Sequence, residues 1–543
     1  MKRIMLLVSC MLVCFGLLSA QSFEWIQTAG YPMANISATD ISGHGVAVDG
    51  QGNVYVAGTF HDTTTFDSKQ LVTDSKGDVF IAKYSGDGTI QWVKQISNDQ
   101  ELFVGDIAVD AAGNSYITGA FNSTTSFDGE EVVSDKATGY TPTYDFYVVS
   151  FGPDGTRRWV QTSTGLSVAA FTSVASNSSG QVVIMGSHNG VITLGGKSTA
   201  NKGYFIGQLN TADGTLAWLT EDGTGIIPST VYGGIAIDGS GNVAIHGAGG
   251  FLAITIGSTQ VTGGFFTAYY DNTGALQWVK TVTGTGFLDS PQAVAFDAAG
   301  NVYTGGSVTA AAVFDTETAD TTGGYVAKYS SAGAIAWVKS ITSSGVAGVS
   351  ALAGGAGKVS AAGYFQITVK FGTDSLTTSA GQNSCFMADY ADDGTVTPIA
   401  AGKTSQEIRA TDICTDASAN LYMTGMFRRH IGFGDIADTA STKSGQGALP
   451  EMFVLKYGSG ASIADHWDLP GTHLHFTIQP NPVPAGQFSC NLGKEANIRL
   501  LDLRGNPVSL KRTGTSISLP QHTPAGIYLL EVNGYPQQKV FVQ

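Results

Sequence analysis

The chain has 543 residues, of which 71 are glycine and only 13% are charged. The 28 basic and 43 acidic side chains give a net charge of −15, which argues against nucleic acid as a partner. A charged share roughly half the usual one, together with the excess of glycine, favours a tightly turned all-β protein over a disordered chain.

Residues 1–20 have the composition of a secretory signal peptide. Basic Lys2 and Arg3 precede an apolar run from Ile4 to Leu18, and small residues follow. That run is too short to span a bilayer, and no later segment is longer, so we expect no transmembrane segment. Residues 7–10 resemble a lipobox, so a lipoprotein remains an alternative.

One pattern recurs about every sixty residues from about residue 40 to residue 458. GVAVDGQGNVYVAGTF at 45–60 returns as DIAVDAAGNSYITGAF at 106–121 and, in divergent form, up to DICTDASANLYMTGMF at 412–427. The glycines that end its second strand mark seven copies, at 58, 119, 186, 247, 306, 363 and 425. Self-similarity at this period indicates stacked supersecondary units.

Each copy contains four short runs rich in β-branched and aromatic residues. In the first copy they are residues 45–48, 53–60, 79–84 and 89–96. Four-stranded antiparallel units repeated around a ring predict an all-β, seven-bladed β-propeller over residues 21–458. The segment SFEWIQTAG at 22–30 matches the fourth run, so we expect the N-terminal strand to complete the seventh blade and close the ring.

The positions that repeat across the copies are expected to serve the fold. Gly52 and Gly88 stand where hairpins require a positive φ. Asp49 and Asp87 are interpreted as turn residues that accept backbone amide hydrogen bonds, with calcium ligation as the alternative. Large aromatic rings at one register are predicted to pack between blades, namely Trp25, Trp92, Trp159, Trp218, Trp278 and Trp337.

The segments GVAVDGQGNVYVAGTF and DVFIAKYSGDGTIQW together resemble the SBBP-type β-propeller repeat of bacterial secreted proteins. The resemblance covers about residues 22–458. It weakens in the third and sixth copies, where Asn177 and Gly354 replace the turn aspartate. It implies a propeller and a secreted protein, and it implies no reaction.

The period ends after Tyr457, and a second region follows. Residues 459–472 read as a linker of small and polar residues, and residues 473–543 as a compact β-sandwich. In that region PNP, LRG, PAGIY and the closing strand stand in order, at Pro480, Asn481, Pro482, Leu503, Arg504, Gly505, Ala525, Gly526, Ile527, Tyr528 and Lys539 to Val542.

These four elements resemble the type A C-terminal sorting domain of the type IX secretion system of Bacteroidota. The resemblance implies that the type IX machinery is a partner. It also implies passage through the periplasm and a final location that is secreted or on the outer-membrane surface. The alternative is an ordinary β-sandwich binding domain.

Cofactor and metal sites are not expected. The cysteines outside the leader, Cys385, Cys414 and Cys490, are widely spaced and lack a CxxC pair, so they are interpreted as core residues. We expect no cofactor, no metal and a monomeric chain.

Binding residues are expected where the copies differ, on the long links that share one face of the propeller. These include the links at 61–77, 122–144 and 428–450. Arginines are suited to carboxylate or sulfate groups, so Arg428, Arg429 and His430 form the leading cluster. The further candidates are His61, Tyr140, Tyr144, His188 and Arg409.

The sequence therefore favours a binding or structural module that holds a glycan or a protein on the long-link face. One alternative is a polysaccharide-active enzyme, for which Asp99 and Glu101 are candidate acid and base groups and which requires convergent titratable groups near the central channel. A quinoprotein is a further alternative, because Asp-Gly-Thr followed by tryptophan resembles the repeat of such propellers.

Overall fold

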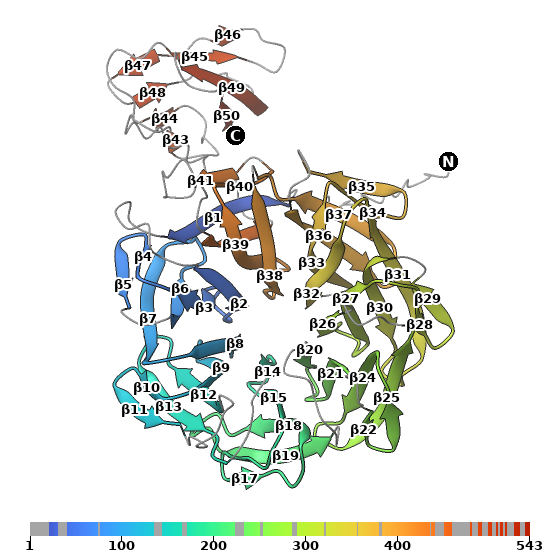
Figure 1. Ribbon diagram of the computed structural model, residues 1–543. Helices are drawn as coiled ribbons and strands as arrows, with labels where there is room; N and C mark the ends of the chain where they lie inside the picture. The colour runs from blue at the N-terminus through green and yellow to red at the C-terminus, as the bar shows by residue number, and fades with distance from the viewer. Residues whose placement is uncertain are drawn as a thin grey trace, which may run out of the picture. The chain divides into compact units, whose positions relative to one another are not determined.

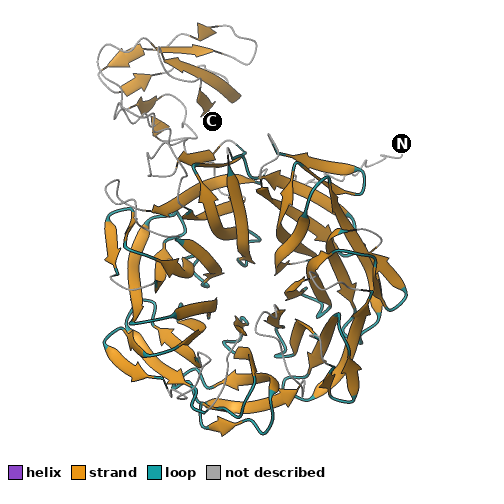
Figure 2. Cartoon of the chain, viewed as in Figure 1, coloured by secondary structure: helices purple, strands orange, loops and turns teal. Residues whose placement is uncertain are grey.

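A computed structural model of the chain consists of β-strands and loops, with no helix among the described residues (Figure 2). It describes residues 21–30, 41–73, 77–134, 144–165, 171–222, 233–249, 253–284, 290–319, 322–355, 357–378, 383–404, 406–434, 436–439 and 450–458, and in the C-terminal region the strands alone. The chain divides into two compact units, of which one spans residues 20–459 and the other holds the C-terminal strands. The predicted leader and linker lie outside the described residues.

The larger unit is built from sets of four strands that pair in antiparallel order. The first set is β2 (Ser42–Val48), β3 (Val54–Phe60), β6 (Asp78–Tyr84) and β7 (Ile90–Asn98), which confirms the four strands expected in the first copy. The next sets are β8 (Leu102–Val109), β9 (Ser115–Phe121), β12 (Asp145–Phe151) and β13 (Arg157–Thr162); β14 (Phe171–Ser176), β15 (Val182–His188), β18 (Gly203–Leu209) and β19 (Leu216–Asp222); and β20 (Gly233–Ile237), β21 (Val243–Ala248), β24 (Phe265–Tyr270) and β25 (Leu276–Thr283).

The remaining sets follow the same order. They are β26 (Ser290–Phe296), β27 (Val302–Val308), β30 (Gly323–Tyr329) and β31 (Ile335–Ser343); β32 (Ala347–Gly355), β33 (Lys358–Gln366), β36 (Asn383–Ala391) and β37 (Val396–Ala401); and β38 (Glu407–Thr415), β39 (Leu421–Arg428) and β42 (Glu451–Gly458) with β1 (Ser22–Gly30). In this last set the N-terminal strand β1 pairs antiparallel with β42, and Trp25 lies opposite Lys456.

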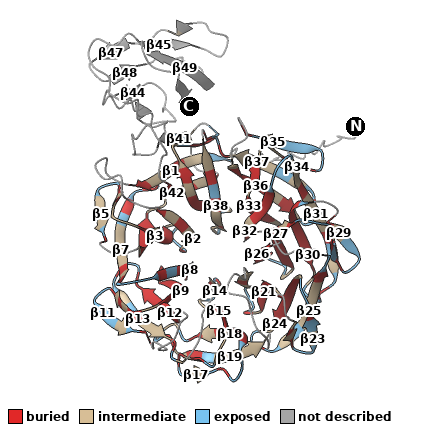
Figure 3. Ribbon diagram, in the orientation of Figure 1, coloured by how far each residue is buried: buried red, intermediate tan, exposed pale blue. Residues whose placement is uncertain are grey.

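The sets stand around a common centre with their first strands innermost (Figure 1). Each inner strand contacts the next one in chain order, and β38 also contacts β2. Buried residues are concentrated in the middle strands, whereas exposed residues lie mainly on the outermost strands (Figure 3). Each core is therefore shared between neighbouring sets.

The links from the second to the third strand of each set differ from the expected long connections, because each contains a further hairpin. These are β4 (Thr63–Phe66) with β5 (Lys69–Val72), β10 (Thr124–Phe127) with β11 (Glu130–Val133), β16 (Thr193–Leu194) with β17 (Lys197–Ser198), β22 (Ile254–Ile256) with β23 (Thr259–Val261), β28 (Ala312–Phe314) with β29 (Glu317–Ala319), β34 (Thr368–Phe371) with β35 (Asp374–Thr377), and β40 (His430–Phe433) with β41 (Ile436–Thr439). Strands β4, β10, β28 and β34 pair with the outermost strand of the preceding set. They thereby cover an edge that would otherwise be open to pairing with other chains.

The turn prediction is confirmed in the first set. Asp49 Oδ1 accepts hydrogen bonds from the amides of Gln51 and Asn53, each at 2.9 Å, and Oδ2 accepts one from Asn53 Nδ2 at 2.8 Å. Asp87 accepts the Thr89 amide at 3.1 Å. These carboxylates satisfy turn amides, which explains their recurrence.

The recurring tryptophans join neighbouring sets, as expected. Their indole N–H groups donate to a backbone carbonyl in the next set at 2.9–3.1 Å, in the pairs Trp25–Gly86, Trp92–Pro153, Trp159–Thr211, Trp278–Ser331 and Trp337–Asp392. The exception is Trp218, which donates to Gln208 within its own set at 2.7 Å.

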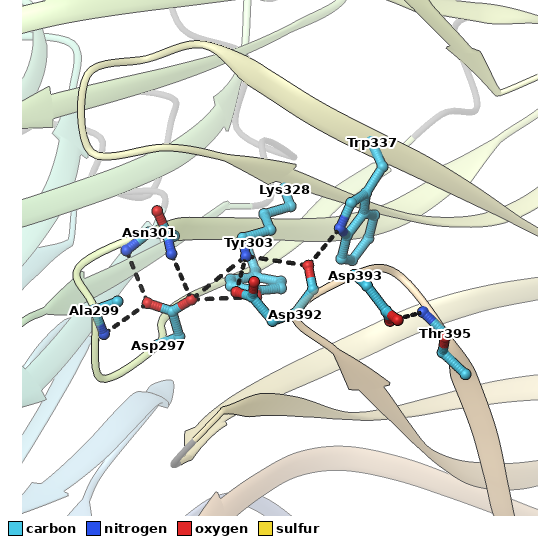
Figure 4. Close-up of polar contacts among 9 residues, drawn as sticks. All are labelled: Asp297, Ala299, Asn301, Tyr303, Lys328, Trp337, Asp392, Asp393 and Thr395. Carbon is cyan, nitrogen blue, oxygen red and sulfur yellow. Dashed lines mark hydrogen bonds and ion pairs between the residues drawn. The ribbon is translucent and has the colours of Figure 1, made fainter.

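Figure 4 shows one such joint, between the set that begins with β26 and the set that begins with β32. Asp297 accepts the Tyr303 hydroxyl at 3.2 Å, and the Lys328 ammonium lies 3.8 Å from the same carboxylate. Lys328 also donates to the Asp392 carboxylate of the next set. The Asp-x-x-Gly-Asn-x-Tyr and Ala-Lys-Tyr elements of the repeat are therefore parts of one joint, and this accounts for their recurrence.

The smaller unit contains two four-stranded antiparallel sheets. They are β43 (Ile478–Gln479), β44 (Gln487–Cys490), β48 (Ser516–Ser518) and β47 (Lys511–Thr513), and β46 (Pro507–Val508), β45 (Ile498–Leu501), β49 (Gly526–Val532) and β50 (Gln538–Val542). Gly526 and Tyr528 lie in β49 and Lys539 in β50, and in their pairing Tyr528 is opposite Val540. Pro480, Asn481, Pro482 and Gly505 lie outside the described residues.

Candidate functional site

The candidate binding residues gather at one end of the strands. Because the strands of a set alternate in direction, residues that follow the second strand lie at the same end as the start of the first. His61 follows β3, His188 ends β15 and Arg428 ends β39, and in register Arg428 is opposite Glu407, the first residue of β38. The aspartate turns lie at the opposite end.

The structure brings two of the predicted arginines together around one carboxylate. Arg409 Nε donates to Glu407 Oε1 at 2.7 Å, and Arg428 Nε donates to Glu407 Oε2 at 3.2 Å. Burial raises the pKa of Glu407, but the charge and hydrogen bond of Arg409, together with hydrogen bonds from Asn383 and Arg428, more than offset this, so its net pKa is lowered. The pair of arginines therefore keeps Glu407 ionised and retains one positive charge in excess.

Further basic groups lie beside this pair. Arg429 occupies the left-handed region with φ 69°, at the point where β39 turns into β40, and the exposed His430 begins β40. Lys403 donates to the carbonyl of Gly434 in the same hairpin. Glu407 is the acid that sequence reasoning missed. Its pairing with Arg428 across two strands could only be found once the register was known.

Tyr144 belongs to a second group, on β8 and the link before β12. Its hydroxyl donates to the Glu101 carboxylate, and its ring meets that of Phe103 edge to face at a centroid distance of 5.3 Å. Asn122 Nδ2 donates to the same carboxylate at 3.4 Å. Burial, the hydrogen bond from Tyr144 to Glu101 and the charge of that carboxylate raise the pKa of Tyr144 to about 12, so the phenol stays neutral.

The other candidates do not join these groups. His188 is only 1% exposed and its ring packs against Phe205 at 5.7 Å, so it is not available at the surface. Burial lowers its pKa, which keeps the ring neutral. His61 is half-buried directly after β3, and Tyr140 lies outside the described residues.

A cavity of about 570 Å³ runs along the inner strands β2, β8, β14, β20, β26, β32 and β38. Asp106 and Asp412 line it from β8 and β38. Asp106 accepts the Ser173 hydroxyl at 2.7 Å, and Asp412 accepts the Val46 amide at 2.8 Å. Each carboxylate thereby reaches the next inner strand.

These two acids have raised pKa values. Burial raises the pKa of Asp106 to about 6. Burial and the charge of Asp106 raise the pKa of Asp412 to about 8. His44 lines the same cavity, and burial lowers its pKa to about 4. At neutral pH Asp106 is therefore a carboxylate, Asp412 a carboxylic acid and His44 a neutral imidazole.

Sequence reasoning named Asp99 and Glu101 as candidate acids and missed Asp106 and Asp412. The available signal was that only two of the seven copies carry an acid four residues before the turn position. Cys414 also corrects an expectation, because it is half-buried and lines the cavity, whereas Cys385 is buried as predicted.

Within the described residues, no group of three or more histidine, cysteine, aspartate or glutamate side chains is placed to hold a metal ion. The part of the chain that the structure describes also contains no helix with the length and apolar character of a membrane span.

The family model described as the SBBP β-propeller repeat matches residues 24–59 and 91–123. No curated protein matches the sequence. Solved structures that are similar include BamB from Moraxella catarrhalis, with 12% identity, a TM-score of 0.32 and coverage of 77% of this chain and 85% of that one.

A polysaccharide lyase of family PL25, an ulvan lyase, is similar at 10% identity and a TM-score of 0.37, over 75% of this chain and 93% of that one. A quinohemoprotein alcohol dehydrogenase from Comamonas testosteroni is similar at 10% identity and a TM-score of 0.31, over 84% of this chain and 79% of that one. The repeated antiparallel sheets and the matched family model agree on one conclusion: this chain is a β-propeller repeat protein of all-β structure.

Proposed function

We propose that the larger unit is a seven-bladed β-propeller closed by its N-terminal strand, and that a C-terminal β-sandwich follows it. The pairing of β1 with β42 supports closure, as does the contact between β38 and β2. Such closure joins residues from the two ends of the propeller in one blade and leaves only short sheet edges.

We further propose that the chain is a secreted or cell-surface protein exported by the type IX secretion system. The composition of residues 1–20 and the ordered PNP, LRG, PAGIY and closing-strand elements support this route. Deleting residues 472–543 is then expected to leave the protein in the periplasm, as measured by cell fractionation. Normal surface delivery of the truncated chain would refute the assignment.

The function that the geometry supports best is binding of an anionic glycan or an acidic protein surface on the long-link face. The observation that carries it is the convergence of Arg409 and Arg428 on Glu407, with Arg429 and His430 adjacent in the chain. Guanidinium groups held by one carboxylate are oriented in advance, and their remaining N–H donors suit carboxylate or sulfate oxygens.

A glycan array probed with the full chain tests this proposal. We expect retention of uronate-containing or sulfated glycans, and a loss of at least tenfold in affinity when Arg409 and Arg428 are both changed to alanine. Lys370→Ala, which removes an exposed cation from β34, is the matched control and should bind normally. Retention of no glycan and no acidic protein would refute the binding function.

Asp106 and Asp412, which line the cavity along the inner strands, favour a second candidate function, a polysaccharide-active enzyme. Two carboxyl groups with different pKa values can take different roles at one pH, because one is protonated while the other is ionised. Asp412 would then be the general acid and Asp106 the general base. We expect new reducing ends or unsaturated products to form from an anionic polysaccharide, and Asp412→Asn to abolish their formation. Absence of product with every polysaccharide that the chain binds would remove this candidate.

A further inference from the structure

Five inner strands carry a β-bulge near their long-link end, within the residues that the structure describes. In β2, β8, β26, β32 and β38 the register with the second strand of the set shifts there by one residue (Figure 1). The extra residues are His44, Gly105, Gln292, Ser350 and Thr411. A bulge removes its extra residue from the strand ladder and can aim the side chain in a new direction.

These bulge residues form the rim of the cavity along the inner strands. On each of the five strands, the bulge residue is the first residue from the long-link end that lines the cavity. His44, Gln292 and Ser350 are half-buried, although both chain neighbours of each are buried. The bulges therefore turn these side chains from the packed sheets toward the cavity. We call His44, Gln292, Ser350 and Thr411 the polar rim.

The polar rim offers uncharged hydrogen-bonding groups. His44 Nε2 lies 3.3 Å from Thr59 Oγ1, and burial lowers the pKa of the ring to about 4. Gln292 Nε2 donates to a serine hydroxyl of its own strand at 3.2 Å, so its Oε1 is the group that can accept from a ligand. Thr411 Oγ1 donates to the Gly43 carbonyl at 2.8 Å, which joins β38 to β2 at the rim. Three of the four side chains are therefore oriented before a ligand binds.

The charged side chains that line the cavity are all aspartates, and no lysine or arginine is among the described lining residues. Asp106 and Asp412 directly follow bulge residues, so they lie just inside the rim. The chain already supplies donors to both. Asp106 accepts the Ile107 amide at 2.8 Å, and Asp412 accepts the amides of Ile413 and Val46, each at 2.8 Å. An anionic ligand would find no opposite charge here, and backbone amides take the place of a ligand cation.

Beyond the rim the cavity has aliphatic walls. Val48, Ala236 and Ile237 line it and are half-buried. Its volume of about 570 Å³ lies within the range of about 300–1,000 Å³ that is typical of small-molecule sites. A pyranose unit suits this combination, because its hydroxyl groups lie around the edge of the ring and its C–H groups form an apolar face.

We propose that the cavity binds an uncharged sugar unit at the end of an oligosaccharide, with its hydroxyl groups on His44, Gln292 and Ser350. The sugar enters from the long-link end, because the polar rim stands there, and its apolar face packs on the aliphatic walls. This site is separate from the pair Arg409 and Arg428 and takes a ligand without charge. It therefore goes beyond the proposed binding of anionic glycans and does not depend on it.

Titration calorimetry of the full chain with uncharged tetrasaccharides of glucose, mannose, galactose and xylose tests the inference. At least one should bind the wild type. Gln292→Leu removes the amide at similar size and should lower the affinity at least fivefold, and Ser350→Trp should abolish binding because the larger ring fills the rim. Gln260→Leu, which changes an exposed glutamine on the outer strand β23, is the matched control and should bind as wild type.

Three results would overturn the inference. They are binding of none of the four sugars, wild-type affinity in both rim variants, and binding of a glucosamine tetramer at least tenfold more tightly than any uncharged sugar. The last result would assign the cavity to cations through Asp106 and Asp412. Melting curves of the variants show whether a loss of binding is local. All three results leave the anionic-glycan proposal standing, because its own test is the glycan array with the arginine variants.

Discussion

Asp106 and Asp412 are acids at a position where the other sets carry small residues. Serine, glycine or alanine occupies the equivalent position elsewhere, at Ser173, Gly234, Ala293 and Ala351, and glycine stands between the two acids at Gly45. An alanine Cβ at Gly45 would lie 3.1 Å from Asp106 Oδ1. The absence of a side chain there lets a carboxylate approach the strand and share the channel with a second one.

The raised pKa values of Asp106 and Asp412 predict that stability falls as the pH rises. From the ordinary value of 3.8, these pKa values rise to about 6 and about 8. Between pH 3.8 and about pH 8, the folded chain therefore binds more protons than the unfolded chain. The associated stabilisation is complete below 3.8 and is lost as the pH rises through about 6 and then about 8.

We therefore expect the thermal midpoint of Asp412→Asn to depend less on pH than that of the wild type over this range. The measurement is a series of melting curves between about pH 4 and pH 9. Asp154→Asn is the control, because that exposed turn acid has its pKa lowered by its hydrogen bonds to Thr156. An unchanged slope in Asp412→Asn would contradict the assignment.

Gly155 and Gly129 make a matched pair for the packing of a tryptophan. Both have a positive φ, of 81° and 91°. An alanine Cβ at Gly155 would lie 3.0 Å from Trp92 Cδ2, whereas one at Gly129 would meet nothing within 4 Å. We expect Gly129→Ala to cost about 1–2 kcal/mol in strain and Gly155→Ala about 1–3 kcal/mol more, measured by urea unfolding. Equal losses would show that Trp92 has room to move.

At the scale of the elements, four of the described outer hairpins tie their set to the one before it, through β4, β10, β28 and β34. They turn through residues with positive φ, such as Asp67, Asp128 and Asp315, and the residue before the turn is buried as Phe66, Phe127 or Phe314. Phe127 packs against Tyr147 at a centroid distance of 5.2 Å and against Phe121 at 5.8 Å, and both rings belong to the same set as the hairpin. The hairpin of β10 and β11 thus pairs with the preceding set by backbone hydrogen bonds and packs into its own set by its aromatic ring.

Phe127→Ala is expected to destabilise the chain by about 3–5 kcal/mol, because the ring is fully buried and would leave a cavity. Val133→Ala in the same hairpin should change stability by no more than about 0.5 kcal/mol. Chemical denaturation measures both. A loss below about 1 kcal/mol in Phe127→Ala would show that the hairpin adds little to the joint between sets.

At the scale of the whole larger unit, strand β1 connects the two ends of the repeat. It pairs with β42 along Ser22 to Ala29, and Trp25 donates to Gly86 of the first set at 3.1 Å. The N-terminal strand therefore contacts the last set and the first set at once. Without it, β42 would present an open edge to other chains.

A chain that lacks residues 1–30 is expected to be at least about 3 kcal/mol less stable than one that lacks residues 1–20, since burial of Trp25 alone is worth about that amount. It is also expected to aggregate through the exposed edge of β42. Thermal unfolding and light scattering measure the two effects. Equal stability and solubility of the two chains would contradict the role of β1 as the closing strand.

The sequence by itself determined the four main strands of a set, the turns and the tryptophan register, because each depends on near neighbours. The Asp49 carboxylate binds amides two and four residues away, and alternation of apolar residues identifies a strand without reference to its partner. The position of β1 also followed from the sequence, because its tryptophan matches the other fourth strands.

Only the tertiary structure decided which side chains meet in the cavity along the inner strands and on the long-link face. Asp412 binds the amide of Val46, 366 positions away in the chain, and Arg428 reaches Glu407 through the register of two strands. Strands β4, β10, β28 and β34 of the outer hairpins likewise pair with the preceding set. These contacts arise because neighbouring sets pack together and because β38, the last inner strand, contacts β2, the first. A local pattern contains no information about such contacts.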